Sequence, residues 1–416
     1  MKKSKYNVAV EYNNHWLIYN LLKATCIILN QEEFERFQRY EKFDGSDQLC
    51  DLGFYIDDHY AEIDEVFYYI QRNTDQRNQN FRKHRIYTTL ACNAHCPYCF
   101  EKGSGCDAMS LDTARKVVQY IIKKQERAKK LVITWFGGEP LLNTKVIDFI
   151  SRELRSELPS DVEYTSFMIT NGLLFDRNIV AMAVQDWKLE GVQITLDGLK
   201  QTYEKVKGFT VENAFEKVIA NIHLLLYAGV KPSIRINYDQ NNFEEVLRLV
   251  DYLGENFDGN DDIHVYAYKI MSDDSPDNSK SASADYDILI WDRILENGFC
   301  KDILQSIKSN MISCTAGSLY NEMFLPNGDI GKCAQAIADG DIVGNIDTGV
   351  RNAKVARWCC GRLNESCLQC TFLPICGGGC MYEFFHEKKG CSVSQKMVEY
   401  KLLQYLKQTI DGCNKA

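Results

Sequence analysis

The stretch ACNAHCPYCFEKG, residues 91–103, carries Cys92, Cys96 and Cys99 in the spacing C-x3-C-x2-C. Metal centres built on thiolates usually have four protein ligands, whereas this stretch offers three thiols. The spacing therefore predicts either a zinc site that His95 completes, or an iron–sulfur cluster with one iron left open for a small chelating ligand. The sequence around the stretch distinguishes these two readings.

The cysteine stretch follows directly on the first of a series of predicted strands. Short runs rich in β-branched and aromatic residues are expected to form strands at 85–90, 131–136, 165–170, 192–196, 233–238 and 263–268. Helical patterns lie between them, one with a possible cap at Ser110 and one with Asn242 and Glu245 in the positions of a capping box. Strands that alternate with helices form parallel βαβ units, and these units fall short of a closed eight-stranded barrel. The prediction is an α/β fold with a partial (β/α)6 TIM-like barrel.

Further motifs stand where the predicted strands end. The sequence FGGEP (136–140) ends the second strand, TNG (170–172) the third and LDG (196–198) the fourth. Because ligand sites of barrel folds lie at the C-terminal ends of the strands, these motifs and the cysteine stretch are expected to converge on one pocket. A zinc site would not require the partner motifs, so the iron–sulfur reading is favoured.

This combination closely resembles the radical SAM superfamily, whose signature is C-x3-C-x2-C after the first strand of a partial barrel, followed by GGEP-type and ribose- and carboxylate-binding motifs. The resemblance implies a 4Fe–4S cluster on Cys92, Cys96 and Cys99, with S-adenosylmethionine chelating the open iron through its amine and carboxylate. One electron from the cluster would cleave the sulfonium, and the resulting 5′-deoxyadenosyl radical would abstract a hydrogen from the substrate. The protein would orient and shield these groups.

The resemblance also implies roles for individual cofactor-binding residues. They are Gly137, Gly138, Glu139, Tyr98, Asn171, Thr195 and Lys207. The glycine pair would let the backbone approach the cofactor closely, and Glu139 could accept a hydrogen bond from its ammonium. Tyr98 would lie beside the adenine, and Asn171 and Thr195 would reach the ribose and carboxylate. Plain alternatives are a core role for Thr195 and a structural turn at Asp197–Gly198.

Lys207 departs from the family pattern. Family members often carry an arginine shortly after the LDG motif, where it holds the carboxylate of S-adenosylmethionine. Lys207 stands at about that place and keeps the charge, but a lysine cannot make the bidentate contact of a guanidinium. No residue of the sequence is assigned as the catalytic base.

The C-terminal third holds a second set of cysteines. They are Cys314, Cys333, Cys367, Cys370, Cys376, Cys380 and Cys391. Their order and spacing match the SPASM domain, a C-terminal extension of radical SAM peptide-modifying enzymes that carries two auxiliary 4Fe–4S clusters. The resemblance assigns one cluster to Cys367, Cys370, Cys376 and Cys391, and the other to Cys314, Cys333 and Cys380. The fourth ligand of the latter is either Cys300 or an open iron that could bind substrate, and two structural zinc knots are the alternative reading of the region.

The chain is expected to divide into three domains. Residues 1–84 read as a small α+β module, 85–299 as the barrel and 300–416 as the cysteine-rich iron–sulfur domain. A polar run at 72–85 looks like a linker into the barrel. Enzymes of this family that modify ribosomally made peptides often carry an N-terminal, winged-helix-like module that grips the leader of the precursor. A structural cap on the barrel is the alternative for this module.

Composition limits the compartment and the partners. The chain has 416 residues, a net charge of −9 and 17 cysteines. An acidic protein is a poor partner for a nucleic-acid backbone. The sequence shows no signal peptide and no apolar run near the roughly 20 residues that span a bilayer. A cytoplasmic protein is predicted, and in a reducing cytosol so many cysteines indicate metal binding rather than disulfides.

The leading functional hypothesis is a peptide maturase with three 4Fe–4S clusters that installs a crosslink, such as a thioether, on a precursor peptide. An electron donor such as flavodoxin or ferredoxin would be a second partner. A sulfatase maturase that makes formylglycine is less favoured, because such enzymes typically have an aspartate just after the cysteine that matches Cys333, where this chain has Ala334. A non-enzymatic iron–sulfur redox protein is the third possibility, but it would have no use for the GGEP and ribose-binding positions.

Overall fold

The computed structural model describes residues 1–270, 280–307, 314–338, 340–359, 363–386, 391 and 393–413. The chain forms two compact units that each combine distant segments. The first unit contains residues 1–75, 300–314 and 361–416, and the second contains 76–299 and 315–360. These units do not follow the expected boundaries at residues 84 and 300. The three-domain organisation stays a prediction.

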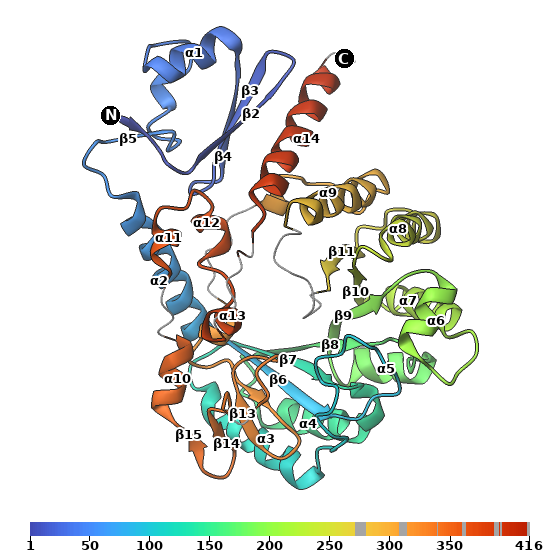
Figure 1. Cartoon of the computed structure of the whole chain (residues 1–416). Coiled ribbons are helices and arrows are strands. Elements are labelled where there is room, and N and C mark those ends of the chain that lie inside the picture. Colours follow the sequence, from blue (N-terminus) through green and yellow to red (C-terminus); the bar gives the residue numbers. More distant parts are fainter. Residues whose placement is uncertain are drawn as a thin grey trace. The chain divides into compact units, whose positions relative to one another are not determined.

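The second unit is built on a parallel sheet (Figure 1). Its strands are β6 (Phe81–Thr89), β7 (Lys130–Gly137), β8 (Glu163–Thr170), β9 (Leu189–Leu196), β10 (Lys231–Tyr238) and β11 (His264–Lys269). They lie side by side in chain order and are all parallel, as the alternation of strand and helix predicts. Within the described residues, β11 pairs with β10 alone, so the sheet is open at this edge. The α/β class is confirmed.

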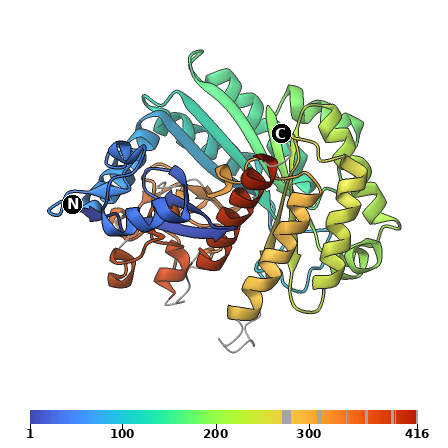
Figure 2. The same ribbon diagram turned by 90° about the horizontal axis from the view of Figure 1, so that it is seen from above.

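Helices cover one face of the sheet (Figure 2). They are α3 (Leu111–Gln125), α4 (Thr144–Glu157), α5 (Arg177–Gln185), α6 (Lys200–Lys207), α7 (Ala214–Tyr227), α8 (Phe243–Phe257) and α9 (Lys280–Glu296), with a 3-10 turn at Pro140–Asn143. Side chains on the helix-facing side, such as Ile194, Ile234 and Ile236, are fully buried. Their alternate neighbours Thr195 and Arg235 are only half-buried, so the opposite face is available for a ligand.

The two predicted helix caps have different outcomes. Ser110 caps α3, since its hydroxyl accepts a hydrogen bond from the Thr113 N–H at 3.0 Å. The prediction of a capping box at Asn242 and Glu245 was wrong, because the Asn242 side chain makes no capping hydrogen bond. The Glu245 carboxylate instead accepts hydrogen bonds from the Leu199 N–H at 2.9 Å and the Thr202 hydroxyl at 2.5 Å, because these donors at the start of α6 lie within its reach.

A small antiparallel extension adds to the free edge of β6. It consists of β12 (Met323–Phe324), β13 (Asp329–Gly331), β14 (Gly344–Asn345) and β15 (Gly349–Val350), followed by α10 (Asn352–Cys359). β12 pairs in parallel with β6, and the following strands pair antiparallel. The segment after β13 packs against the face of the sheet that the helices leave open. There Tyr87 donates a hydrogen bond to the Ala334 carbonyl at 2.9 Å. Cys333 therefore belongs to the same unit as the first cysteine stretch.

The first unit contains the N-terminal module together with the C-terminal segment. Its elements are β1 (Lys2–Lys3), β2 (Asn7–Tyr12), β3 (His15–Asn20), β4 (Thr25–Asn30), α1 (Gln31–Arg39), β5 (Tyr55–Ile56), the start of α2 (Glu62–Asn80), α11 (Glu365–Leu368), α12 (Leu373–Cys376), α13 (Met381–Phe385) and α14 (Gln395–Cys413), with 3-10 turns at Ser46–Gln48 and Gln305–Ile307. β2, β3 and β4 form an antiparallel sheet against which α14 packs. The predicted linker at 72–85 was wrong, because α2 runs to Asn80 and β6 begins at Phe81.

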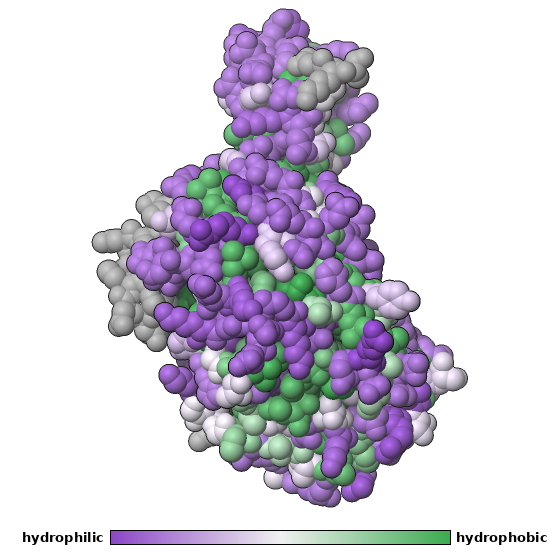
Figure 3. All heavy atoms as spheres, turned by 90° about the vertical axis from the view of Figure 1, so that its right-hand side faces the viewer, coloured by the Kyte–Doolittle hydropathy of each residue, from purple (hydrophilic) through white to green (hydrophobic). Residues whose placement is uncertain are grey.

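The surface of the described chain is mixed in character. On the side seen in Figure 3, hydrophilic side chains dominate and hydrophobic ones lie between them. Among the described residues, no helix is both long enough and apolar enough to cross a membrane.

Candidate active site at the carboxyl ends of the parallel strands

The loop that carries Cys92, Cys96 and Cys99 follows β6 and is held from two sides. On one side, the Gly138 and Glu139 N–H groups donate to the Thr89 and Ala91 carbonyls at 3.1 and 2.9 Å. On the other, the His95 N–H donates to the Lys207 carbonyl at 2.6 Å, at the end of α6. The loop is thus fixed between the end of β7 and the end of α6.

The three thiols lie on one short loop and influence one another. Burial raises the pKa of Cys92 to about 11, and the nearby Cys96 and Cys99 contribute in the same direction. The Ala94 N–H lies 3.4 Å from the Cys92 Sγ, a donor that would stabilise a thiolate. His95, the candidate fourth zinc ligand, has its Nδ1 at 3.3 Å from the Gly208 carbonyl. Three thiols with a backbone donor are a donor set that fits an iron–sulfur cluster.

The glycine pair at the end of β7 is required because the backbone that leads into the cysteine loop packs closely against it. A Cβ on Gly137 would lie 2.0 Å from the Thr89 carbonyl oxygen, and one on Gly138 would lie 2.3 Å from that of Ala91. Gly137 also has a φ of +120°, which side chains rarely adopt. The close approach visible here is therefore between β7 and the cysteine loop, and the predicted approach to a cofactor stays a prediction.

Glu139 is fully buried at the end of the second strand. Its carboxylate accepts hydrogen bonds from the Thr170 hydroxyl at 2.8 Å, the Asn171 N–H at 2.8 Å and the Leu141 N–H at 3.1 Å. Burial raises the pKa of Glu139, while these bonds oppose the rise. The Thr170 hydroxyl also lies 2.9 Å from the second carboxylate oxygen, so both oxygens have donors in the protein. Contact of Glu139 with the cofactor amine stays a prediction.

A group of three side chains, of which Asp197 and Lys207 are buried and Tyr98 is half-buried, joins the cysteine loop to the end of β9 and to α6. The Lys207 ammonium lies 2.9 Å from the Asp197 carboxylate, and both side chains are at most 4% exposed. The Tyr98 hydroxyl donates to the other Asp197 oxygen at 2.5 Å and lies 3.3 Å from the Lys207 Nζ. Burial opposes charge on Lys207, but Asp197 and its neighbours hold the pKa of the ammonium well above its usual value.

This arrangement shows a residue that the sequence reasoning set aside. Asp197 was considered only as part of a structural turn, yet it binds both Tyr98 and Lys207. Its signal in the sequence was its position directly after a predicted strand. Contacts of Tyr98 and Lys207 with S-adenosylmethionine stay predictions.

Asn171 and Thr195 lie on neighbouring strand ends. The Asn171 amide donates to the Asn93 side chain at 2.7 Å, which ties the third strand end to the cysteine loop. Asn93 was also missed from the sequence. Thr195 is half-buried on the open face of the sheet and pairs in register with Arg235. The structure thus brings the four sequence motifs to one rim.

The C-terminal cysteines are partly assembled. Burial raises the pKa of Cys376, and Cys370, Cys367 and Cys391 lie close enough to add to the rise. Backbone N–H groups also donate to sulfur, from Phe372 to Cys370 at 3.4 Å and from Gly378 to Cys376 at 3.3 Å. These four thiols are the set assigned to one auxiliary cluster. Ligation itself stays a prediction.

The second auxiliary set is divided between the two units. Cys314 and Cys380 belong to the first unit, and Cys333 to the second. Cys300, the possible additional ligand, is half-buried beside Lys401, whose ammonium opposes the rise that burial causes in the pKa of the thiol. The grouping of Cys314, Cys333 and Cys380 stays a prediction. Across the described part of the chain, no three His, Cys, Asp or Glu side chains are arranged to hold a single metal ion.

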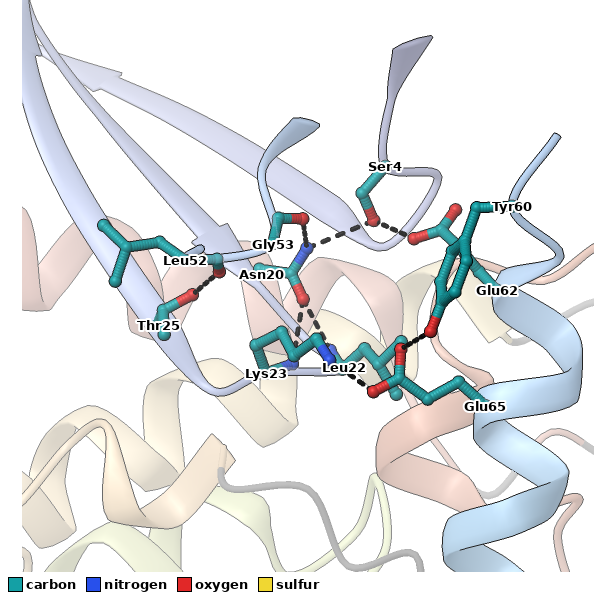
Figure 4. A network of polar contacts seen from close by, with 10 residues as sticks. All are labelled: Ser4, Asn20, Leu22, Lys23, Thr25, Leu52, Gly53, Tyr60, Glu62 and Glu65. Carbon is teal, nitrogen blue, oxygen red and sulfur yellow. Dashed lines mark hydrogen bonds and ion pairs between the residues drawn. The ribbon is translucent and has the colours of Figure 1, made fainter. Parts of the chain in front are cut away.

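The N-terminal module has a polar network of its own (Figure 4). Asn20 is buried at its centre, where its amide donates to the Gly53 carbonyl at 2.8 Å and its oxygen accepts from the Leu22 and Lys23 N–H groups at 3.0 and 2.9 Å. Glu65 pairs with Lys23 and accepts from the Tyr60 hydroxyl at 2.7 Å. The network fixes the β3–β4 turn to α2 beside a surface pocket of about 290 Å³.

Comparison with known families matches residues 86–253 to the radical SAM superfamily. The chain carries a radical SAM domain. The match begins in β6, includes the cysteine loop and ends in α8, so it contains the rim described above.

Curated relatives resemble about two fifths of the chain. The GTP 3′,8-cyclase of Clostridium acetobutylicum is 32% identical over 168 residues, which cover 39% of this chain and 48% of the cyclase. The radical SAM cyclopropyl synthase TigE of Paramaledivibacter caminithermalis is 24% identical over 185 residues, 40% of this chain and 39% of that protein. The chain thus spans about half, or less, of the curated relatives it matches.

Solved structures show the same fold over a longer part of the chain. Native anSMEcpe with bound AdoMet has a TM-score of 0.61 and 17% identity, and the match covers 80% of this chain and 99% of the other. SuiB of Streptococcus suis, bound to S-adenosylmethionine, has a TM-score of 0.54 and 15% identity, with 94% of this chain and 97% of the other covered. At these identities the likeness concerns the fold.

Proposed function

We propose that the chain is a radical SAM peptide maturase that installs a crosslink, such as a thioether, on a ribosomally made precursor peptide. The observation that carries the proposal is the extent of the structural likeness. The match to SuiB includes the parts outside the radical SAM domain, and SuiB has also been solved with its precursor peptide SuiA, at a TM-score of 0.52. The match to the cyclase covers only 39% of this chain.

The residues at the rim suit this chemistry. Cys92, Cys96 and Cys99 would hold the cluster, and Glu139, fixed by Thr170, Asn171 and Leu141, would accept a hydrogen bond from the amine of S-adenosylmethionine. The bound cluster would supply the electron that cleaves the sulfonium. The protein residues would orient the cofactor, and the buried Asp197–Lys207 pair would fix Tyr98 beside the cluster loop.

The auxiliary clusters and the partners belong to the same proposal. Two SPASM-type clusters would bring the total to three 4Fe–4S clusters. Reduction would come from an electron donor such as flavodoxin or ferredoxin, and the reaction would take place in the cytoplasm. The N-terminal module would bind the leader as an added strand along the edge of β2 or β4, where backbone hydrogen bonds supply affinity.

The sulfatase-maturase alternative finds less support. The position after Cys333 is Ala334, which packs with Tyr87, Phe136 and Met323 in an apolar cluster. A methyl group in such surroundings cannot serve as a base. The fold similarity to anSMEcpe keeps this alternative as the second candidate.

Anaerobic assays separate these possibilities. The reconstituted full chain is mixed with S-adenosylmethionine and dithionite, and 5′-deoxyadenosine is measured. An enzyme forms it, and replacement of Cys92, Cys96 and Cys99 by alanine abolishes it, whereas an iron–sulfur redox carrier forms none. The enzyme is then incubated with GTP, with a sulfatase-derived peptide or with short peptides encoded beside the gene. The compound that is converted to a product identifies the substrate class. Conversion of GTP without modification of any peptide would overturn the proposal.

A further inference from the structure

Arg235 is a cation on the open face of the sheet whose role the cofactor site does not account for. It lies on β10 and pairs in register with Thr195 on β9 and Tyr266 on β11. Its side chain is half-buried. Because alternate residues of a strand share a face, Arg235 points away from the helices that cover the other side.

The guanidinium is held in a fixed orientation. Its Nε donates to the Asn237 side-chain oxygen at 2.9 Å, and its Cζ lies 3.9 Å from the centre of the Tyr268 ring. Stacking on a ring and a hydrogen bond through Nε leave the two terminal nitrogens free to bind a planar anion. Within the described part of the chain, no carboxylate forms an ion pair with Arg235.

The surroundings of Arg235 are open and aromatic. Tyr268, the ring on which the guanidinium stacks, is 44% exposed. Tyr266 donates its hydroxyl to Gln193 at 2.8 Å. An exposed ring beside an oriented arginine is typical of a binding surface rather than of a core.

The carboxylate of S-adenosylmethionine is a poor match for this arginine. By the family resemblance, this carboxylate binds the open iron, so it lies at the cysteine loop. Lys207 is the cation beside that loop, where its ammonium lies 3.3 Å from the Tyr98 hydroxyl. Arg235 is one strand beyond Thr195, toward the open edge of the sheet.

We propose that Arg235 and Tyr268 form a carboxylate-binding site for the substrate, and that this site takes an Asp or Glu side chain of the peptide. The inference rests on the proposed peptide maturase function and names the chemistry of its substrate. The arginine would fix one acidic residue of the peptide through two hydrogen bonds, so that a neighbouring residue lies near the cofactor end of β9.

Binding of defined peptides tests the proposal on the full reconstituted chain. The probes are two fluorescein-labelled peptides, Ala-Glu-Ala-Glu-Ala and its glutamine counterpart Ala-Gln-Ala-Gln-Ala, both with blocked ends, and dissociation constants are measured by fluorescence anisotropy. The wild type should bind the glutamate peptide about tenfold more tightly, as expected for hydrogen bonds to charged groups. Arg235→Gln should remove this preference, and Arg235→Lys should retain part of it. Equal binding of both peptides by the wild type would overturn the proposal.

Controls distinguish a substrate site from a cofactor site. Arg248, exposed on the outer side of α8, provides the matched variant Arg248→Gln, which should keep the preference. Equilibrium dialysis with S-adenosylmethionine and its decarboxylated form should give the same affinities for Arg235→Gln as for the wild type. A loss confined to S-adenosylmethionine would assign Arg235 to the cofactor and overturn the proposal. Absence of 5′-deoxyadenosine in the wild type would instead refute the proposed function, independently of the peptide result.

Discussion

Asp197 illustrates how single residues connect the candidate site. Its carboxylate joins Tyr98 from the cysteine loop to Lys207 from α6, and the side chains of Asp197 and Lys207 are both buried. Buried charges are stable only in pairs, because an unpaired charge in the interior keeps its full desolvation cost. Lys207, the predicted counterpart of the family arginine, is therefore positioned by an aspartate that the sequence suggested only as a turn residue.

Replacement of one member of this pair should destabilise the protein. We expect Asp197→Asn to lower the free energy of unfolding by about 3 kcal/mol, because the Lys207 charge would remain buried without a partner. Urea unfolding measures the change. The control is Glu32→Gln, which breaks the exposed Glu32–Arg36 pair and should cost less than about 1 kcal/mol. Similar losses in both variants would contradict the buried-pair account.

Replacement of Gly138 should also disturb the site, because an added side chain would not fit there. A methyl group there would lie 2.3 Å from the Ala91 carbonyl oxygen, so Gly138→Ala must displace the cysteine loop. The variant should reconstitute with about four fewer irons than the wild type, the content of one cluster. Gly340→Ala is the control, since a Cβ there meets no atom within 4 Å. An unchanged iron content in Gly138→Ala would show that the loop tolerates the displacement.

At the scale of elements, α6 is held by its neighbour α8. Glu245 in the first turn of α8 accepts hydrogen bonds from Leu199 and Thr202 at the start of α6. The far end of α6 accepts the His95 N–H of the cysteine loop. A contact between two helices therefore supports the loop that carries the thiols.

Loss of this contact should loosen α6 without affecting α8. We expect Glu245→Ala to accelerate hydrogen exchange of the amides at 200–207, because two donors at the helix start lose their acceptor. The matched control is Glu244→Ala, one residue earlier and exposed. Mass spectrometry of exchanged peptides distinguishes them, and equal protection of α6 in both variants would show that Glu245 is dispensable.

At the scale of the whole molecule, the N-terminal module shares one compact unit with the segment that carries Cys367, Cys370, Cys376 and Cys391. Lys5 donates to the Leu368 carbonyl at 2.9 Å, next to Cys367, and Tyr12 contacts Asp411 of α14. Removal of the module would therefore disturb the cysteine-rich segment as well as any leader binding. Truncation alone cannot separate these two roles.

This shared unit predicts the outcome of deleting residues 1–72. The intact chain should reconstitute with about twelve irons, from three four-iron clusters. The truncated chain should lose at least about four of them, since Cys367, Cys370, Cys376 and Cys391 lose the module against which their segment packs. Iron and sulfide analysis measures both proteins. A full iron content after truncation would show that the cysteine-rich segment holds its clusters independently.

Peptide capture by the module is better tested in the intact chain. If the leader adds as a strand, the amides of β2 or β4 should become protected from hydrogen exchange when the precursor is added. Protection restricted to the second unit would favour a purely structural role for the module.

The sequence by itself determined the α/β class, the six parallel strands and the place of the motifs. Strand and helix periodicities are local, and parallel strands necessarily bring their carboxyl ends to one rim. Cys92, Cys96 and Cys99 were recognisable because their spacing is short and their loop follows a strand directly. Only the tertiary structure decided which polar groups meet across that rim.

The contact of Tyr98 with Asp197, that of Asn171 with Asn93 and the stacking of Arg235 on Tyr268 all depend on packing between segments that are separated in the chain. The capping box predicted at Asn242 and Glu245 is absent for a similar reason. A glutamate three residues after an asparagine is a local signal, but the Leu199 and Thr202 donors come from another helix and take the carboxylate. Local patterns fix where elements form, whereas burial and the competition among hydrogen-bond partners, which the linear sequence does not contain, decide what each side chain does.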